Sequence, residues 1–170
     1  MHSIKNTHRE VKSFTIRVYA LIIKDRKEIL LSDEYRMGMP MTKFPGGGMR
    51  PGESTLECLH REAIEEFGQD IDIIRHYYTT DFFQQAAFFP DKQLVSIYYL
   101  AQFTEAITFP ISNKIMDITY TEGSQSFRWQ SIDSLHADTL TFPIDKKVAT
   151  MIRADFDTQQ HFSYSIDSTI

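Results

Sequence analysis

Three glutamates spaced to share one face of a helix are the residues of this chain best suited to chemistry. Glu62, Glu65 and Glu66 are separated by three and four positions, which places them side by side on an α-helix. Like charges at this spacing repel one another, and a bound cation is one way to relieve crowded carboxylates. Mg²⁺ takes oxygen ligands from carboxylates and from substrate phosphates. The spacing therefore indicates either a metal site or an ordinary solvated acidic face.

The residues on either side of these glutamates predict where their helix begins and ends. Ser54 is a favourable N-cap, and Glu57 three residues later completes a capping box. Gly68 suits a left-handed C-terminal cap. Upstream, three consecutive glycines and a Pro-Gly pair predict that the backbone before Ser54 is loop. We therefore expect a helix between Ser54 and Gly68, preceded by a glycine-rich loop.

The stretch over residues 47–69 resembles the Nudix box, whose pattern is G-x5-E-x7-R-E-U-x-E-E-x-G-U, with U a bulky apolar residue. Two positions depart from the pattern: Ala63 is smaller than usual, and Gln69 is polar where an aliphatic residue is expected. Neither departure removes a charge. The seven fixed positions are all matched, by Gly47, Glu53, Arg61, Glu62, Glu65, Glu66 and Gly68.

This resemblance implies a hydrolase dependent on Mg²⁺ or Mn²⁺. Members of the family generally cleave the diphosphate bond of a nucleoside diphosphate linked to another group. By the resemblance, Glu62 and Glu66 are direct metal ligands, and Glu65 is a third ligand or is bridged by water. Glu53 and Arg61 correspond to an ion pair that holds the loop and the helix in register. The catalytic set that follows is Glu65, Glu122, Arg61 and Glu53.

The general base is not settled by the sequence. Several family members use an acid from a distal loop, and the candidates here are Glu105 and Glu122, or a glutamate of the box itself. Glu122 precedes Gly123 in a loop shortly before Trp129, and similar loops of the family carry the distal acid. A loop position also suits a group that must move in once substrate is bound. We therefore favour Glu122.

Substrate contacts are expected from the glycine loop and from two arginines. Gly47 and Gly48 allow the backbone to approach metal and phosphates closely. Arg50 lies within the box, and Arg36 lies in residues 33–42, which read as a loop. That loop either borders the substrate or is an ordinary surface connection.

A function of a different class is kept as an alternative. Some Nudix-like domains bind nucleotides as sensors without turnover, and the loss of a box carboxylate would have favoured that reading. None is lost. The sequence gives the substrate only as a class, and it leaves the particular nucleoside diphosphate derivative open.

Composition narrows the function classes. The chain has 170 residues, 42% of them hydrophobic and 24% charged, with a net charge of −5. These values suit one globular domain over residues 1–170, and the negative charge argues against a partner that is a nucleic-acid polymer. The single cysteine, Cys58, excludes a disulfide framework and reads as a small packing residue. No apolar run is long enough for a membrane span, and the first twelve residues are too polar for a signal peptide, so a cytoplasmic protein is expected.

The remaining pattern predicts a mixed α/β fold, and the resemblance implies an α/β/α sandwich with a mixed sheet. Predicted strands cover residues 13–24, 28–32, 71–83, 93–103 and 126–130; a helical turn covers 131–135, and a helix starts at Pro143 and runs to about Asp155. A polar arm (1–12) and a polar tail (156–170) flank them, and Phe162, Tyr164 and Ile166 in the tail alternate like an edge strand.

Four phenylalanines near the second half of the sheet are expected in its core, with base stacking or a homodimer contact as alternatives: Phe82, Phe83, Phe88 and Phe89.

Overall fold

A mixed seven-stranded sheet forms the centre of the molecule, and the computed structural model describes it within residues 10–158. Five strands follow one another in the order β3-β2-β1-β6-β5, with β4 paired to β1 and β7 paired to β2. The strands are β1 (Ser13–Lys24), β2 (Glu28–Arg36), β3 (Met39–Lys43), β4 (Gly46–Gly48), β5 (Ile71–Thr79), β6 (Lys92–Phe103) and β7 (Ser124–Ser131).

One parallel pairing joins the two halves of this sheet. β1 and β6 run parallel over ten residue pairs, from Ser13 opposite Lys92 to Ile22 opposite Ala101. The other strand pairs are antiparallel, including the hairpin of β1 and β2. Since a parallel pair needs a long crossover, the chain between β1 and β6 has room for β2, β3, β4, the first helix and β5. The mixed sheet expected from the sequence is confirmed.

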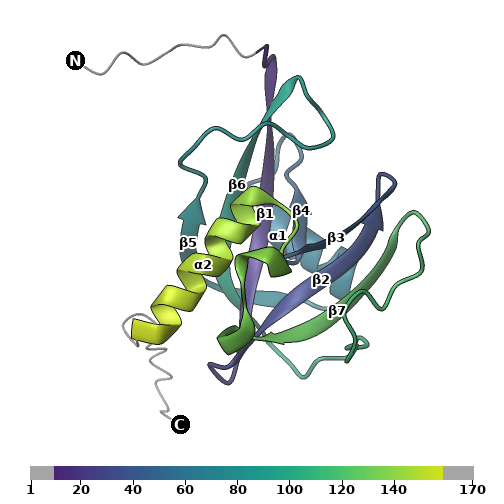
Figure 1. Cartoon of the computed structure of the whole chain (residues 1–170), viewed down its shortest axis with the longest axis vertical. Coiled ribbons are helices and arrows are strands. Elements are labelled where there is room, and N and C mark those ends of the chain that lie inside the picture. Colours follow the sequence, from purple (N-terminus) through teal and green to yellow (C-terminus); the bar gives the residue numbers. More distant parts are fainter. Residues whose placement is uncertain (1–9, 159–170) are drawn as a thin grey trace.

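Two helices lie on opposite faces of the sheet, so the α/β/α arrangement is confirmed (Figure 1). Helix α1 (Thr55–Phe67) packs through Leu59 and Phe67 against alternate residues of β1, among them Val18 and Ala20. Helix α2 (Pro143–Thr158) and two short 3₁₀ turns, η1 (Ile132–Ser134) and η2 (Ala137–Thr139), cover the other face, where Leu21 belongs to the core. The alternation along β1 follows from the two-residue period of a strand.

Most elements agree with the sequence, but two segments predicted as loop are strands. Residues 33–36 continue β2, and β3 forms a hairpin with it through Met37 and Gly38. The glycine triplet is β4, paired with β1 at Val18. The first error arose because Asp33 and Glu34 are buried charges, which resemble loop residues in a sequence. The second arose because three glycines normally mark a turn.

The phenylalanine-rich segment was also predicted wrongly. β5 ends at Thr79, so the four phenylalanines lie in the connection to β6, and none of them is buried. Phe82 is 37% exposed and Phe89 is 47% exposed. These four rings therefore lie outside the core of the sheet. The proposed strand at Phe162 to Ile166 falls outside the described residues, as does most of the N-terminal arm.

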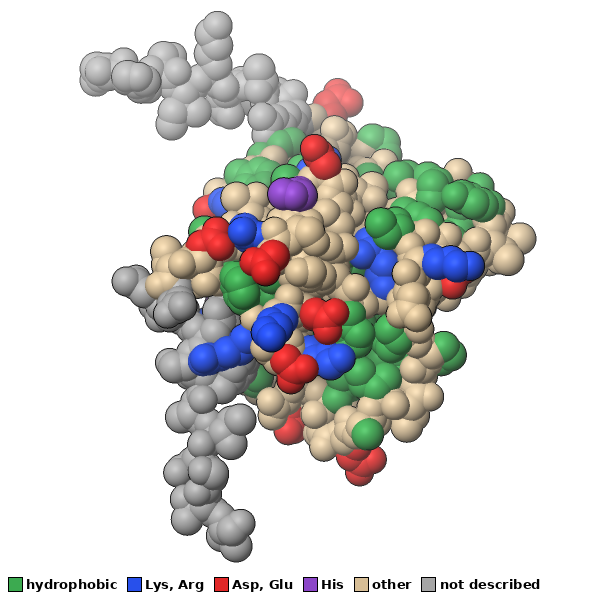
Figure 2. Space-filling model, turned by 60° about the horizontal axis from the view of Figure 1, so that its bottom comes forward, with side chains coloured by type: hydrophobic (Ala, Val, Ile, Leu, Met, Phe, Trp, Pro, Cys, Tyr) green, Lys and Arg blue, Asp and Glu red, His purple; other side chains and the backbone are tan. Residues whose placement is uncertain are grey.

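Two other expectations concern surfaces and packing. Cys58 is a free, fully buried thiol, and burial raises its pKa to about 12, which suits a packing residue. On the visible part of the face in Figure 2, acidic and basic side chains are intermixed, without an extended basic patch. Among the described residues, no helix is long and apolar enough to cross a membrane.

Candidate active site

Helix α1 is fixed at both ends by the caps that the sequence predicts. The Ser54 side chain accepts a hydrogen bond from the Glu57 backbone N–H, and the Glu57 carboxylate accepts one from the Ser54 backbone N–H. Gly68 closes the helix in the left-handed conformation at φ 70°, with its N–H donating to Ile64. These caps fix where the helix begins and ends, and the packing of Leu59, Ala63 and Phe67 against the sheet leaves its three glutamates off the core face.

Arg61 joins the helix to the loop before it. Its guanidinium donates to both oxygens of Glu53, at 3.0 and 2.7 Å, and to the carbonyl oxygen of Gly48 at 2.9 Å. It also donates to Glu62 at 2.7 Å and to Glu65 at 3.1 Å. The fork on Glu53 has the bidentate geometry of a strong charge-assisted pair, and it lowers the pKa of Glu53 to about 2. The expected Glu53–Arg61 contact is therefore present.

Gly47 allows the strand β4 to lie directly against the helix. A Cβ atom at this position would stand 2.3 Å from the carboxylate of Glu62, closer than any side chain tolerates. At Gly48 the nearest atom to such a Cβ, on Arg17, is 3.9 Å away, so there is ordinary room for a side chain. These contacts concern Glu62 and Arg17, and the close approach of both glycines to metal and phosphates stays a prediction.

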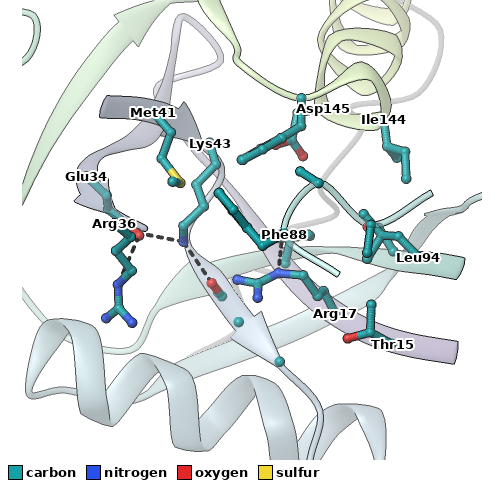
Figure 3. Close-up of a pocket in the computed structure, with 18 of the residues that line it drawn as sticks. Thr15, Arg17, Glu34, Arg36, Met41, Lys43, Phe88, Leu94, Ile144 and Asp145 are labelled. Carbon is teal, nitrogen blue, oxygen red and sulfur yellow. Dashed lines mark hydrogen bonds and ion pairs between the residues drawn. The ribbon is translucent and has the colours of Figure 1, made fainter. Parts of the chain in front are cut away.

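A cavity of about 500 Å³ opens beside the box glutamates. Glu62, Glu65 and Glu66 line one end of it, together with Glu34 and Lys43. Figure 3 shows Glu34 and Lys43 at this end. All of these groups present oxygen or nitrogen atoms, so this end of the cavity is polar and charged.

A buried lysine is at the centre of the charged end. The Lys43 ammonium donates to Glu34 at 2.7 Å and to the Gly46 carbonyl oxygen at 2.8 Å, and it lies 3.4 Å from Glu66 (Figure 3). Burial lowers the pKa of Lys43, but the attraction of Glu66 and Glu34 outweighs it, so its pKa is raised overall. Burial raises the pKa of Glu34, yet Lys43 reverses this, and the net shift is downward. Lys43 is therefore a permanently charged group.

Glu66 is held on both of its oxygens. One accepts from the Gly46 backbone N–H at 2.9 Å, and the other lies near Lys43 and accepts from the Gln125 amide at 3.1 Å. Burial raises the pKa of Glu66, an effect that Lys43 opposes and that the neighbouring Glu34 carboxylate reinforces. The Glu34 and Glu66 carboxylates therefore share one ammonium.

The other end of the cavity has a polar floor and apolar walls. Arg17 donates to the hydroxyl of Tyr19 at 2.6 Å, and Tyr98 donates to Asp145 at 2.6 Å. The rings of Tyr19 and Tyr98 stack with centroids 5.2 Å apart, since these residues face each other across β1 and β6. The walls are Ala86, Phe88, Leu94, Phe142 and Ile144.

Asp145 has one carboxylate oxygen with no hydrogen bond recorded among the described residues. It is 2% exposed, it lines the cavity, and burial raises its pKa to about 6. Tyr98 donates to Oδ1, and within residues 10–158 the structure records no hydrogen bond to Oδ2. A buried carboxylate with a raised pKa in a cavity is typical of a functional group. Figure 3 shows Asp145 and Ile144 across the cavity from Glu34.

Carboxylate oxygens are the ligands that a hard divalent cation prefers, but the oxygens of the box glutamates do not meet at one point in this structure. Among the described residues, no three acidic, histidine or cysteine side chains are arranged to hold a metal ion. The reason is that Arg61, Lys43 and Arg50 already bind the carboxylates. Glu62 keeps one oxygen, Oε2, for which no hydrogen bond is recorded among those residues. The Arg50–Glu65 pair is 61% and 47% exposed, so breaking it costs little.

The remaining predicted residues are placed as follows. Glu122 lines the cavity and accepts from the Met37 backbone N–H at 3.1 Å. Glu105 is exposed and is not among the residues that line the cavity. Arg36 lines the cavity with its side chain 62% exposed, 3.6 Å from Glu34, and Arg50 lines it beside Glu65.

Sequence reasoning missed four groups at this cavity. Arg17 is a charge within an otherwise apolar strand, and that interruption was the available signal. Glu34 was hidden in the segment predicted as loop (residues 33–42), and Lys43 follows that segment directly. Asp145 read as an ordinary acidic residue in the first turn of a helix.

Comparison with known proteins gives a consistent picture. The NUDIX domain family model matches residues 13–151. No curated protein sequence matches the chain. A NUDIX hydrolase from Nitrosomonas europaea has a similar structure at 21% identity and a TM-score of 0.60, over 86% of this chain and 90% of that one. MutT protein from Methanosarcina mazei is similar at 21% identity and a TM-score of 0.60, over 88% and 97%.

A third similar structure is an ADP-ribose pyrophosphatase from Streptococcus suis, at 18% identity and a TM-score of 0.55, over 86% of this chain and 92% of that one. At these identities the solved structures support the fold alone. The family follows from the model match, which spans most of the chain and contains the whole glutamate box. The chain therefore belongs to the Nudix family, as its NUDIX domain over residues 13–151 shows.

Proposed function

We propose that this protein is a Mg²⁺- or Mn²⁺-dependent pyrophosphohydrolase that acts on a nucleoside diphosphate linked to another group. The observation that carries the proposal is the complete box, with Glu62, Glu65 and Glu66 lining one end of a cavity large enough for a nucleotide. The reaction adds one water across the diphosphate. A new P–O bond forms to the water oxygen, the bridging P–O bond breaks, and the water loses a proton.

The metal would be held by Glu62 and Glu66, with Glu65 as a third ligand or bridged to the metal by water. When bound, a divalent cation neutralises charge on the diphosphate oxygens and activates a water. Within the described part of the chain, no hydrogen bond is recorded to Oε2 of Glu62, and Glu65 is exposed enough to exchange its arginine partners. Arg61 keeps the helix and the glycine loop in register while this happens. Arg50, released from Glu65, is then free to contact a phosphate.

The second half of the cavity suits the nucleoside part of such a substrate. Arg17 lines the cavity, and among residues 10–158 the hydrogen bond recorded for its side chain uses Nε, which leaves its terminal nitrogens for a ligand (Figure 3). An arginine there suits a phosphate oxygen. Beyond it, the apolar walls around Phe88 and Leu94 suit a flat base, and Asp145 suits an N–H donor on its edge (Figure 3).

A substrate panel separates turnover from binding alone. Nucleoside triphosphates, dinucleoside polyphosphates, nucleotide sugars and ADP-ribose would be incubated with the protein and Mg²⁺, and products separated by ion-exchange chromatography. We expect cleavage of at least one of them into phosphorylated products, and none in the presence of a chelator. If tight binding occurs without cleavage of any compound, the non-catalytic Nudix-like binding module is the better description.

The distal general base is tested by a pair of variants. Glu122 lines the cavity from an exposed loop, whereas Glu105 does not line it. Removing a general base typically costs 10²–10⁴-fold, so we expect Glu122→Gln to lower kcat by at least about tenfold and Glu105→Gln to leave it unchanged. Both variants should melt at the wild-type temperature, because both residues are exposed. Equal, near wild-type rates would assign the base to helix α1.

The buried Asp145 carboxylate should destabilise the folded protein at pH values above its raised pKa. The folded-state pKa of about 6 exceeds the ordinary value of 3.8, so the penalty for ionising it develops as pH rises between these values. Such a shift corresponds to about 3 kcal/mol. We expect Asp145→Asn to raise the melting temperature at pH 7.5 but not at pH 4, and to raise KM more than it lowers kcat.

The control for this test is Asp138→Asn, whose side chain is 97% exposed near the same helix. It should show neither effect. An Asp145→Asn variant that melts like the wild type at both pH values would show that the carboxylate carries no buried charge.

A further inference from the structure

Arg17 is a charged side chain in the floor of the cavity for which no carboxylate partner is recorded within residues 10–158. Its recorded hydrogen bond there runs from Nε to the Tyr19 hydroxyl at 2.6 Å. Arg50 and Lys43 line the same cavity, and each of them is paired with a glutamate. Both terminal nitrogens of Arg17 therefore keep their N–H donors for a ligand.

Two hydroxyl groups accompany this guanidinium on the same face of β1. Thr15, Arg17 and Tyr19 are two residues apart along the strand, so their side chains point to one side, and all three line the cavity. In the part of the chain that the structure describes, no hydrogen bond is recorded for the Thr15 hydroxyl, and no acceptor is recorded for the proton of the Tyr19 hydroxyl. Each of the three groups can therefore donate a hydrogen bond to an anion.

The guanidinium lies where the two halves of the cavity meet. On one side it reaches toward strand β4, because a Cβ atom at Gly48 would stand 3.9 Å from Nη1 of Arg17. On the other side are the apolar walls that include Phe88 and Leu94 (Figure 3). A nucleotide with its diphosphate at the box glutamates and its nucleoside between these walls would place the phosphate joined to the sugar at Arg17.

We propose that Arg17, with the hydroxyls of Thr15 and Tyr19, binds the phosphate of a nucleoside monophosphate without any metal, and that this product inhibits the protein. The inference rests on the proposed function, because hydrolysis of the diphosphate leaves the nucleoside with this phosphate. Once the bridging P–O bond breaks, the phosphate is a monoester with a charge of about −1.5 to −2 at pH 7, more than it carries within the diphosphate. Arg17 consequently attracts the product more strongly than it attracts the same phosphate of the substrate.

Binding in the absence of metal tests this assignment. The wild-type protein in excess chelator would be titrated calorimetrically with AMP, GMP, CMP and UMP, with the matching nucleosides, and with inorganic phosphate. We expect one of the monophosphates to bind at least about tenfold more tightly than both its nucleoside and inorganic phosphate, because charge-assisted hydrogen bonds are the stronger ones. A monophosphate series that binds no better than the nucleosides, or no better than inorganic phosphate, would overturn the proposal.

Three variants locate the phosphate within the cavity. Arg17→Met removes the guanidinium and keeps an unbranched side chain, so it should weaken the monophosphate by at least about tenfold and leave the nucleoside unaffected. Thr15→Val keeps the shape of the side chain, removes one donor and should weaken the monophosphate several-fold. Arg50→Met is the matched control, because Arg50 stays paired with Glu65 in chelator, and affinity should stay within about twofold of the wild type. Equal losses in Arg17→Met and Arg50→Met would show that the general charge of the cavity attracts the phosphate, which contradicts the assignment to Arg17.

Inhibition is measured with Mg²⁺ and a substrate found in the panel. The monophosphate that binds in chelator should raise the apparent KM and leave kcat unchanged, and Arg17→Met should need at least about tenfold more of it for the same inhibition. Turnover that stays uninhibited at saturating monophosphate would refute the product inhibition. The titrations in chelator use neither metal nor substrate, so a protein that binds the monophosphate through Arg17 but cleaves nothing would contradict the proposed hydrolase and support the phosphate subsite.

Discussion

Glu62→Gln is expected to abolish most of the turnover while leaving the fold intact. Glutamine can keep its oxygen toward Arg61, which then places an amide N–H₂ where the free Oε2 of Glu62 now faces the cavity. Loss of a partner that only supports a metal ligand typically costs 10–100-fold, so loss of the ligand itself should lower kcat by at least about 10³-fold. Steady-state kinetics on a cleaved substrate, with melting curves beside them, make the measurement.

Glu57→Gln is the matched control on the same helix. Glutamine also serves in a capping box, and Glu57 lies away from the cavity. This variant should retain near wild-type kcat. If Glu62→Gln were as active as Glu57→Gln, Glu62 would have no part in holding a cation, and the arrangement proposed for the site would have to be abandoned.

Arg61→Ala is expected to impair stability and rate together. The substitution leaves Glu53 without its bidentate partner, the Gly48 carbonyl without its donor and Glu62 without its neutralising charge. The loop and the helix would no longer be held in register, and a misplacement of about 1 Å in a catalytic group can cost about 10²-fold in rate. We expect a rate loss of that order and a clearly lower melting temperature.

Arg50→Ala provides the comparison, because Arg50 makes one ion pair with Glu65 at the exposed edge. Exposed pairs contribute little to stability, so this variant should melt close to the wild type. Differential scanning calorimetry distinguishes the two. Equal melting temperatures for Arg61→Ala and Arg50→Ala would show that the contacts of Arg61 do not stabilise the loop.

The helix of the box could be predicted from sequence because its determinants are local. Ser54, Glu57 and Gly68 act within one turn of their own position, and the structure confirms all three. The spacing of Glu62 and Glu66 is likewise a property of a helix, independent of what packs around it. Strand β1 could also be predicted from sequence, since apolar and β-branched residues make up most of it.

The parts that were missed depend on contacts between distant residues. Asp33 looks like a loop residue until Arg128, on β7, is seen to donate to it at 2.8 Å. Lys43 and Glu34 show their role only when β2 and β3 pair and helix α1 packs above them. The same holds for Asp145, whose burial follows from how α2 lies on the sheet. No local pattern contains this information.

The measurement that tests the account most directly is hydrolysis in water enriched in oxygen-18. The wild-type protein, with Mg²⁺ and a substrate identified in the panel, would be compared with Glu62→Gln, and the products weighed by mass spectrometry. We predict one oxygen-18 atom in one of the two phosphorylated products from the wild type, and negligible product from Glu62→Gln or in chelator. Product that carries no label, or equal label from Glu62→Gln, would contradict a reaction in which water attacks phosphorus at the box glutamates.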